Sequence, residues 1–382
     1  MYLTKEEEKT LKGEFGEIKA KAMRILVTLG DIFNADKLIN IESTQIAGVS
    51  YKTIGEAGLE FLEDWANSNV QVTVESWMNP AGIDLEEWNE LGFPKEFAEK
   101  QLSIIKALTS MGIKQSCTCT PYHNNLVPNK GTHIAWSESS AVIFVNSVLG
   151  AMTNREGGPS ALSAAIIGKT PNYGLHLNEN RIGQIVFNVD FELNNLEFSL
   201  LGYHIGKLSD DKIPVIKGIK KASWVQLKAL GAGAAASGGV AMFMIQGITP
   251  EFRITDNPEV FEVSRKDLTK VQEKLTNGSE PDIITFGCPH CSYEEINSIL
   301  QNIKTEKEVW IFTSKKIKKL FPNLPSNVKI FSDTCMVVSP LEEMGIGCLA
   351  TDSSKAAHYT QNLSKIKSVL KSREVLLNEN RR

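Results

Sequence analysis

The spacing of apolar and polar residues along the chain predicts a mixed α/β architecture. Thr4 and Glu7 form a capping-box pattern at the start of an amphipathic helix. Helical spacing recurs at residues 54–65 and 94–111. Short apolar runs that predict strands stand at residues 46–50, 70–74, 283–286, 309–312 and 328–331. Because a helical segment separates the last two runs, we expect a parallel sheet over about the last hundred residues.

The chain is long enough to form more than one domain. Its 382 residues exceed the size at which a single hydrophobic core usually keeps growing, so two or three packed domains are expected. We predict an N-terminal α/β domain at residues 1–165, a middle α/β domain at 166–275 and a C-terminal α/β domain at 276–382. The residues that follow Cys335 are expected to form a helical tail.

The composition is that of an ordinary soluble globular protein, with 42% hydrophobic and 23% charged residues. The net charge of −4 comes without a long basic run, which argues against nucleic acid as a partner. Residues 229–250 lack charge, but their glycines, alanines and serines favour a tightly packed internal helix or loop over a membrane span. These glycines match neither the phosphate-loop nor the dinucleotide-binding pattern. The N-terminus lacks a secretory pattern, so we predict a cytoplasmic protein with no membrane partner.

Six cysteines, at positions 117, 119, 288, 291, 335 and 348, are the first candidates for chemistry. In such a chain we expect metal binding or simple burial rather than a disulfide scaffold. Cys119, Cys288 and Cys335 each follow a predicted strand, and loops at the carboxyl ends of strands meet in one crevice. The spacing of Cys288 and Cys291 also fits a zinc site completed by Cys119 and a histidine. The residues alone leave an iron–sulfur site, a zinc site and buried structural thiols as alternatives.

The segment of residues 136–159 is rich in small polar residues and contains two charged candidates. Glu138 stands just before the apolar run 141–145, where a buried carboxylate must be hydrogen-bonded or paired. Arg155 carries a guanidinium that can hold a substrate carboxylate through two parallel hydrogen bonds. A capped helix start followed by a solvated loop explains the same residues without any chemistry, and on spacing alone it is the slightly better interpretation.

Two loops at predicted strand ends are candidate anion sites. Gly48–Ser50 and Asn79–Pro80 both lead from a strand into a helix or a turn. Backbone N–H groups and the helix dipole favour an anion at such places. Each loop is a weak signal by itself, since many loops share this pattern.

Five ordered blocks of sequence resemble the aconitase X family, and together they span nearly the whole chain. The blocks are residues 118–122, 133–141, 141–158, 287–290 and 333–340. The stretch from Trp136 to Gly158 is the most specific of them. The resemblance implies an aconitase-like multi-domain core with parallel or mixed sheets flanked by helices.

The resemblance also implies an iron–sulfur hydro-lyase, a dehydratase whose cluster is held by Cys119, Cys288 and Cys335. We expect a 4Fe-4S cluster, with 3Fe-4S and 2Fe-2S as alternatives. This ligand set replaces the pairing of Cys288 with Cys291 that spacing favours. Three cysteine ligands leave one iron open, and that iron can act as a Lewis acid on a hydroxyl leaving group.

The site candidates come from the matched blocks, from the two strand-end loops and from the polar turn that contains Lys355. Glu138 and Ser139 are the catalytic candidates. Lys355 is a further candidate for binding substrate, and its alternative interpretation is a surface lysine in a salt bridge. The substrate-binding candidates are Gly48, Val49, Ser50, Asn79, Pro80, Glu138, Ser139, Asn146, Ser147, Arg155 and Lys355.

Members of the family occur as one long chain or as two subunits, in which a small swivel domain is supplied separately. The segment after Cys335 is too short to be that domain, so we expect a small partner subunit that supplies the catalytic serine. The substrate is expected to be a phosphorylated hydroxy acid, mevalonate 5-phosphate, dehydrated for isoprenoid synthesis, because the chain is split and its strand-end loops can hold an anionic end.

Two alternatives to this function remain. Other branches of the family dehydrate cis-3-hydroxy-L-proline. A non-catalytic scaffold subunit that binds zinc is the alternative from another class of protein. Retention of the three matched cysteines with Glu138 and Arg155 argues against a scaffold.

Overall fold

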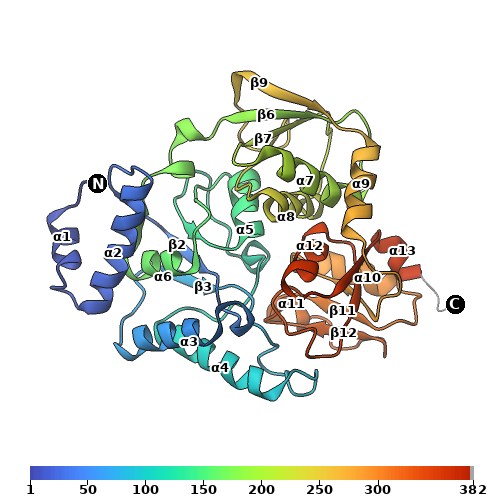
Figure 1. Ribbon diagram of the computed structural model, residues 1–382, viewed down its shortest axis with the longest axis horizontal. Coiled ribbons are helices and arrows are strands. Elements are labelled where there is room, and N and C mark those ends of the chain that lie inside the picture. Colours follow the sequence, from blue (N-terminus) through green and yellow to red (C-terminus); the bar gives the residue numbers. More distant parts are fainter. Residues whose placement is uncertain (379–382) are drawn as a thin grey trace.

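The computed structural model describes residues 1–378, which form three packed units (Figure 1). In that view the N-terminal unit lies on the left, the middle unit at the top and the C-terminal unit at the lower right. No helix within residues 1–378 has the length and apolar content needed to cross a membrane. The last four residues of the predicted third domain, 379–382, lie outside the described residues.

The N-terminal unit combines a three-stranded parallel sheet, in the order β3-β2-β4, with an antiparallel pair formed by β1 and β5. The capping box predicted at Thr4 and Glu7 is confirmed. The strands are β1 (Leu38–Asn40), β2 (Ser43–Ile46), β3 (Glu75–Met78), β4 (Ala135–Trp136) and β5 (Lys169–Pro171). The helices are α1 (Lys5–Leu11), α2 (Glu17–Ile32), α3 (Tyr51–Asn67), α4 (Lys95–Ser110), α5 (Ser139–Phe144) and α6 (Gly158–Ile167).

The middle unit has a four-stranded parallel sheet in the order β8-β7-β6-β9, with two long helices packed beside it (Figure 1). Its strands are β6 (Gly183–Asn188), β7 (Pro214–Lys217), β8 (Met244–Ile245) and β9 (Ile254–Glu262). Its helices are α7 (Asn195–Ser209), α8 (Trp224–Gly238) and α9 (Arg265–Leu275).

The C-terminal unit contains the parallel sheet that the sequence predicts, in the order β12-β11-β10-β13-β14. Its strands are β10 (Ile283–Phe286), β11 (Val309–Phe312), β12 (Val328–Phe331), β13 (Cys348–Thr351) and β14 (Lys367–Leu370). Its helices are α10 (Tyr293–Asn302), α11 (Lys315–Lys318), α12 (Ser354–Leu363) and α13 (Arg373–Asn378). The predicted α/β class is therefore confirmed.

Two element predictions are wrong. Residues 70–74 form no strand, because the N–H groups of Val72 and Thr73 bond the carbonyls of Met111 and Ala165, and β3 begins only at Glu75. The segment after Cys335 is not a helical tail, because β13 and β14 extend the sheet of the C-terminal unit. The predicted strand at residues 46–50 is shifted: β2 ends at Ile46, and the following residues lead into α3.

The glycines of the uncharged segment allow α7 and α8 to cross in close contact. A Cβ atom on Gly202 of α7 would lie 2.0 Å from the Leu230 carbonyl oxygen of α8. A Cβ on Gly233 of α8 would lie 2.5 Å from the Ser199 carbonyl oxygen of α7. Since backbone atoms cannot give way cheaply, only glycine fits at these positions. The expected close backbone packing is confirmed.

The largest hydrophobic core joins all three units around α5. Ala141, Val142, Ile143 and Phe144 of this helix are fully buried and pack with residues of α7, α8, β6 and α12. The residues just before α5 therefore enter the centre of the molecule (Figure 1). This position fixes the start of α5 beside the C-terminal unit.

Candidate active site

Cys119, Cys288 and Cys335 are buried on three loops that come from two units. Cys119 lies five residues beyond Lys114, which forms an isolated parallel bridge with Trp77 of β3. Cys288 follows β10 and Cys335 follows β12, two strands of one parallel sheet whose carboxyl ends face the same edge. The structure therefore brings these loops toward one crevice, as expected for strand ends in an open sheet.

The three thiols influence one another electrostatically. Burial first, and then the negative charges of Glu138 and Cys335, raise the pKa of the Cys119 thiol well above its usual value. Burial is also the main cause that raises the pKa of Cys288 to about 12, and the charge of Cys335 adds to it. The Lys355 ammonium lowers the pKa of Cys119 and Cys288 but does not offset burial, so these thiols stay neutral. Metal coordination is what deprotonates a thiol in this setting.

Backbone N–H groups favour the thiolate form of two of the cysteines. The N–H of His290 donates to the Cys119 Sγ at 3.2 Å. The backbone N–H groups of Val338 and Val337 lower the pKa of the Cys335 thiol, although burial, the largest effect, keeps the net pKa above its usual value. Donors of this kind stabilise a thiolate and tune the potential of a bound cluster.

Glu138 and Lys355 form a buried ion pair beside the cysteines. Glu138 caps the N-terminus of α5, and its Oε2 accepts hydrogen bonds of 2.6 Å from the Ser140 hydroxyl and the Ala141 N–H. Its Oε1 contacts the Lys355 ammonium, which also lies 3.3 Å from the Ser139 Oγ and 3.1 Å from the Ser140 Oγ. The helix-cap interpretation of Glu138 is therefore correct, and the carboxylate has a second role as a buried ionic partner. A surface salt bridge, the alternative interpretation of Lys355, is wrong because only 8% of its side chain is exposed.

The ion pair keeps both groups charged. Burial is the largest single effect and pushes the pKa of Glu138 upward, but the Lys355 ammonium together with the hydrogen bonds from Ser140 and Ala141 outweighs it, and the net pKa falls below its usual value. Burial lowers the pKa of Lys355, whereas Glu138 and then the sulfurs of Cys288 and Cys119 raise it, and the net pKa lies above its usual value. A carboxylate and an ammonium thus stand ionised next to the three thiols.

Asn146 and Ser147 lie in internal hydrogen-bond networks. The Asn146 side-chain amide donates to the carbonyls of Thr153 and Ala241, both at 2.9 Å, and accepts from the Thr153 N–H at 3.1 Å. The Ser147 hydroxyl accepts from the Phe243 N–H at 2.8 Å. Both residues belong to the π-helical turn Val145–Leu149 that follows α5, so these bonds hold that turn against its neighbours.

The strand-end loops lie against the Cys335 loop. The Ser50 hydroxyl donates to the Val338 carbonyl at 2.8 Å, which ties the start of α3 to the turn after Cys335. The Asn79 Oδ1 is buried and has no hydrogen-bond partner among residues 1–378. Gly48 adopts a positive φ of 76°, Val49 and Pro80 are buried, and the Ala81 N–H donates to the Asp333 carbonyl.

Arg155 is exposed, and its Nη1 lies beside Gly239 at the C-terminus of α8. Within the described part of the chain it forms no ion pair or hydrogen bond. Its guanidinium therefore remains available to an anion, unlike that of Arg181, which is buried and bonded to Glu251.

The remaining cysteines lie apart from the three. Cys291 packs in the core of the C-terminal sheet with Ile284, Phe286 and Val309, although it is only three residues from Cys288. Cys117 belongs to the core of the N-terminal unit and Cys348 opens β13. Within residues 1–378, no group of three or more His, Cys, Asp or Glu side chains is placed to hold a single metal ion. A zinc site built on Cys288 and Cys291 therefore lacks a preformed set of ligands in the described residues.

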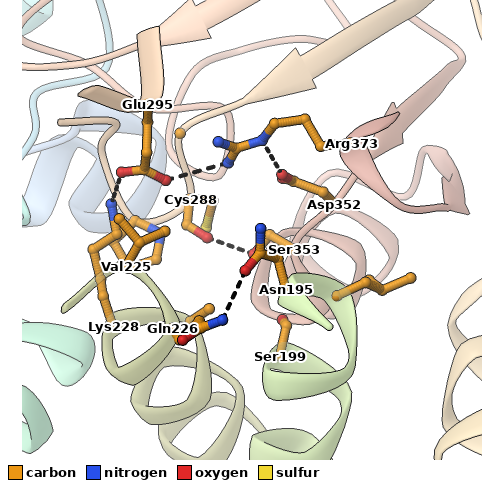
Figure 2. Close-up of a pocket in the computed structure, with 14 residues that line it drawn as sticks. Asn195, Ser199, Val225, Gln226, Lys228, Cys288, Glu295, Asp352, Ser353 and Arg373 are labelled. Atoms are coloured by element: carbon orange, nitrogen blue, oxygen red, sulfur yellow. Dashed lines mark hydrogen bonds and ion pairs between the residues drawn. The ribbon is translucent and has the colours of Figure 1, made fainter. Parts of the chain in front are cut away.

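An ionic network that the sequence analysis missed lies behind Cys288, where it lines a pocket (Figure 2). Lys228 and Arg373 both contact Glu295, and Lys228 also donates to the His290 carbonyl at 2.8 Å. Burial raises the pKa of Glu295, but the two cations outweigh it and lower the pKa to about 2. The feature of the sequence that could have indicated this network is Lys228, because it is the only charged residue of α8.

Sequence comparison assigns nearly the whole chain to three consecutive domains. Residues 1–179 match the model of the aconitase X first domain, residues 183–273 that of the second domain and residues 281–381 that of the third domain. The domain boundaries predicted at residues 165 and 275 stay predictions.

Several characterised proteins resemble the chain over nearly its full length. The phosphomevalonate dehydratase large subunit of Methanocaldococcus jannaschii is 47% identical over 402 residues, covering 99% of both chains. That of Methanosarcina mazei is 46% identical, covering 99% of this chain and 97% of the relative. The cis-3-hydroxy-L-proline dehydratase of Pseudomonas aeruginosa is 31% identical, and the match covers 92% of this chain but 65% of the relative.

A solved structure has the same fold. The crystal structure of Thermococcus kodakaraensis aconitase X in its holo-form superimposes with a TM-score of 0.92 at 43% sequence identity. The superposition covers 99% of this chain and 100% of that one.

Proposed function

The chain belongs to the aconitase X family, and we propose that it is the large subunit of a cytoplasmic phosphomevalonate dehydratase. The reaction removes water from (R)-mevalonate 5-phosphate to give trans-anhydromevalonate 5-phosphate for isoprenoid synthesis. The observation that carries this proposal is identity of 44–47% to four phosphomevalonate dehydratase large subunits, against 30–31% to the cis-3-hydroxy-L-proline dehydratases.

Cys119, Cys288 and Cys335 would hold an iron–sulfur cluster, for which we favour the 4Fe-4S type over 3Fe-4S or 2Fe-2S. The donor set fits, because the three thiols are buried, the charge of Cys335 raises the pKa of the other two, and the His290 N–H donates to the Cys119 sulfur. When bound, such a cluster supplies a Lewis acid for a hydroxyl leaving group. The cysteines of an iron–sulfur cluster bind different irons, so they need not surround one point as the ligands of a single metal ion do.

Glu138, Ser139 and Lys355 would position the substrate beside the cluster. Lys355 holds Glu138 ionised, so this carboxylate can accept a hydrogen bond from the substrate hydroxyl. The Lys355 ammonium can in turn bind a substrate carboxylate, a charge-assisted contact strengthened by burial. The Ser139 hydroxyl lies within reach of the same ammonium and completes this polar group.

The remaining substrate-binding candidates surround this centre. Arg155 is a free guanidinium suited to a phosphate or a carboxylate. The loops Gly48–Ser50 and Asn79–Pro80 lie at the Cys335 loop and offer further polar atoms, among them the unpartnered Asn79 Oδ1. Asn146 and Ser147 would support the site through the turn that follows α5.

A small swivel subunit would complete the enzyme and supply a serine as the base. Support comes from the name "large subunit" of the most similar relatives and from the cis-3-hydroxy-L-proline dehydratases, of which the matching part is about two thirds. The group that removes the substrate proton is therefore expected on the small subunit and not on the present chain.

The test is to co-express the chain with its small partner, reconstitute the complex anaerobically with iron and sulfide, and measure loss of mevalonate 5-phosphate. We expect turnover by the wild type and none by the Cys119→Ser variant. Cys291→Ala is the matched control, because Cys291 is equally buried but lies in the apolar core. A complex with bound iron and sulfide that leaves mevalonate 5-phosphate unchanged but dehydrates cis-3-hydroxy-L-proline would overturn the substrate assignment.

A further inference from the structure

His290 is the point at which the three cysteine loops meet. Its side chain is fully buried, and it lies two residues from Cys288. The Nδ1 atom is 3.0 Å from the Thr118 hydroxyl, next to Cys119, and the Nε2 atom is 2.8 Å from the Thr334 carbonyl, next to Cys335. One imidazole thus connects the loops of all three proposed cluster ligands.

The backbone of His290 makes two further contacts. Its N–H donates to the Cys119 Sγ at 3.2 Å, and its carbonyl accepts from the Lys228 ammonium at 2.8 Å. Thr118 belongs to the N-terminal unit, Lys228 to the middle unit and Thr334 to the C-terminal unit. Every polar atom of His290 is therefore bonded, and its partners come from all three units.

The chemistry of the partners fixes the hydrogen positions. A carbonyl oxygen can only accept, so Nε2 carries the hydrogen that goes to Thr334. In the neutral ring Nδ1 then accepts from the Thr118 hydroxyl, which itself accepts from the Thr120 N–H at 3.2 Å. The direction of both hydrogen bonds is thereby determined. A side chain of another shape can bond either the Thr118 hydroxyl or the Thr334 carbonyl, but not both.

We propose that His290 is a positioning residue that sets the relative placement of Cys119, Cys288 and Cys335, so that the protein receives its iron–sulfur cluster with the ligands already arranged. The inference rests on the proposed cluster function. The cysteines are separated by 169 and 47 positions in the sequence, so no local structure fixes their spacing. Hydrogen bonds from a buried neighbour of the ligands supply that constraint, and loss of such neighbours typically lowers metal affinity by about 10–100-fold.

Three variants separate the two side-chain bonds. His290→Asn places an amide near the position of Nδ1 and keeps the bond to Thr118, whereas His290→Gln reaches the position of Nε2 and keeps the bond to Thr334. His290→Ala removes both. His176→Asn is the matched control, because it alters another buried histidine that lies on the segment joining the N-terminal and middle units.

The measurement is made on the full chain with its small partner after anaerobic reconstitution. Iron and acid-labile sulfide are counted, and the rate at which a chelator removes iron is followed by absorbance. Thermal unfolding of each cluster-free protein is measured in parallel. We expect iron loss at least about 10-fold faster in His290→Ala than in wild type, with intermediate rates in the Asn and Gln variants and a wild-type rate in His176→Asn.

Two results would overturn the inference. Equal iron retention by wild type and His290→Ala would show that His290 does not position the ligands. Rates that follow the unfolding temperatures of all the variants, the control included, would reduce its role to general stability. Failure of the wild type itself to take up iron and sulfide would instead refute the proposed cluster function on which the inference rests.

Discussion

Single residues at this site carry charge into the protein interior, and Glu138 with Lys355 is the clearest case. Both side chains are at most 8% exposed, so each has lost most of its hydration. Two hydrogen bonds from Ser140 and Ala141 complete the shell of the carboxylate. A buried pair of this kind contributes little net stability when it is intact, but removal of one partner leaves an uncompensated charge.

Lys355→Met should therefore destabilise the cluster-free protein by about 3–5 kcal/mol, because Glu138 is left buried without a counter-charge. Glu138→Gln should also be destabilising, because the Lys355 ammonium loses its partner. The double variant should be more stable than the sum of the single effects predicts, since it buries no charge at this position. Urea unfolding of the four proteins measures the coupling, and strictly additive effects would contradict a direct interaction.

Part of this arrangement is visible in the sequence. Glu138, before an apolar run, was expected to need a partner if buried, and its role as a helix cap follows from position alone. Lys355 stands 217 positions away, and no periodicity links the two residues. The same limit applies to His290, because its partners are brought together by the packing of three units.

At the scale of elements, the crossing of α7 and α8 depends on glycines that meet backbone rather than side chains. The nearest atoms to a Cβ on Gly233 would be the Ser199 carbonyl oxygen at 2.5 Å and the Tyr203 nitrogen at 2.8 Å. A Cβ on Gly231, one half-turn earlier on α8, would meet the Ile143 side chain at 3.0 Å. Gly231 and Gly233 thus lie on the same helix, but a methyl group would meet side chains at the first and backbone atoms at the second.

Gly233→Ala should consequently cost about 2–3 kcal/mol of unfolding free energy, because the helices must move apart to admit the methyl group. Gly231→Ala should cost less than about 1 kcal/mol, since the Ile143 side chain can shift and alanine favours the helix. Denaturant unfolding compares the two proteins directly. Equal costs would mean that the close approach of the helices does not depend on Gly233.

Elements with a strong local pattern are the ones that the sequence predicts. β10, β11 and β12 fall at the expected residues, and α3 and α4 differ from expectation by a few positions at their ends. The strands β13 and β14 were missed because each contains a single β-branched residue and no aromatic one, whereas β10, β11 and β12 are rich in both kinds. β13 is fixed by pairing with β10, about 65 residues earlier in the sequence, and β14 in turn pairs with β13.

At the scale of the whole molecule, the units are joined by buried or half-buried charged residues at their boundaries. Lys52 of α3 donates to the Ser339 carbonyl, the Ser364 hydroxyl and the Glu342 carboxylate of the C-terminal unit. Lys228 of α8 joins the middle unit to Glu295 in the same way. Since the cysteine loops lie at these boundaries, the placement of the site depends on how the units pack.

Buried neutral histidines give the whole molecule a dependence on pH. His176 is 3% exposed, with its Nδ1 at 3.0 Å from the Nδ1 of His133. Burial first, and then positive charge on His133 and Arg181, lower its pKa to about 3. Because the pKa is about 6.5 in the unfolded chain, the unfolded state binds more protons below pH 6.5, and stability must fall as the pH falls from there toward 3.

His176 should lower the unfolding free energy of the cluster-free protein by up to about 1.4 kcal/mol per pH unit between pH 6 and pH 4.5. Asp333 works against this slope, because burial raises its pKa to about 6 and the folded state then gains protons in the same range. The His176→Asn variant isolates the histidine, since all other groups are common to both proteins. Urea unfolding at pH 7.5, 6.0, 5.0 and 4.5 should give a shallower curve for the variant, with the two curves parallel only above pH 6.5. Parallel curves down to pH 4.5 would show that His176 is protonated as easily in the folded protein as in the unfolded chain.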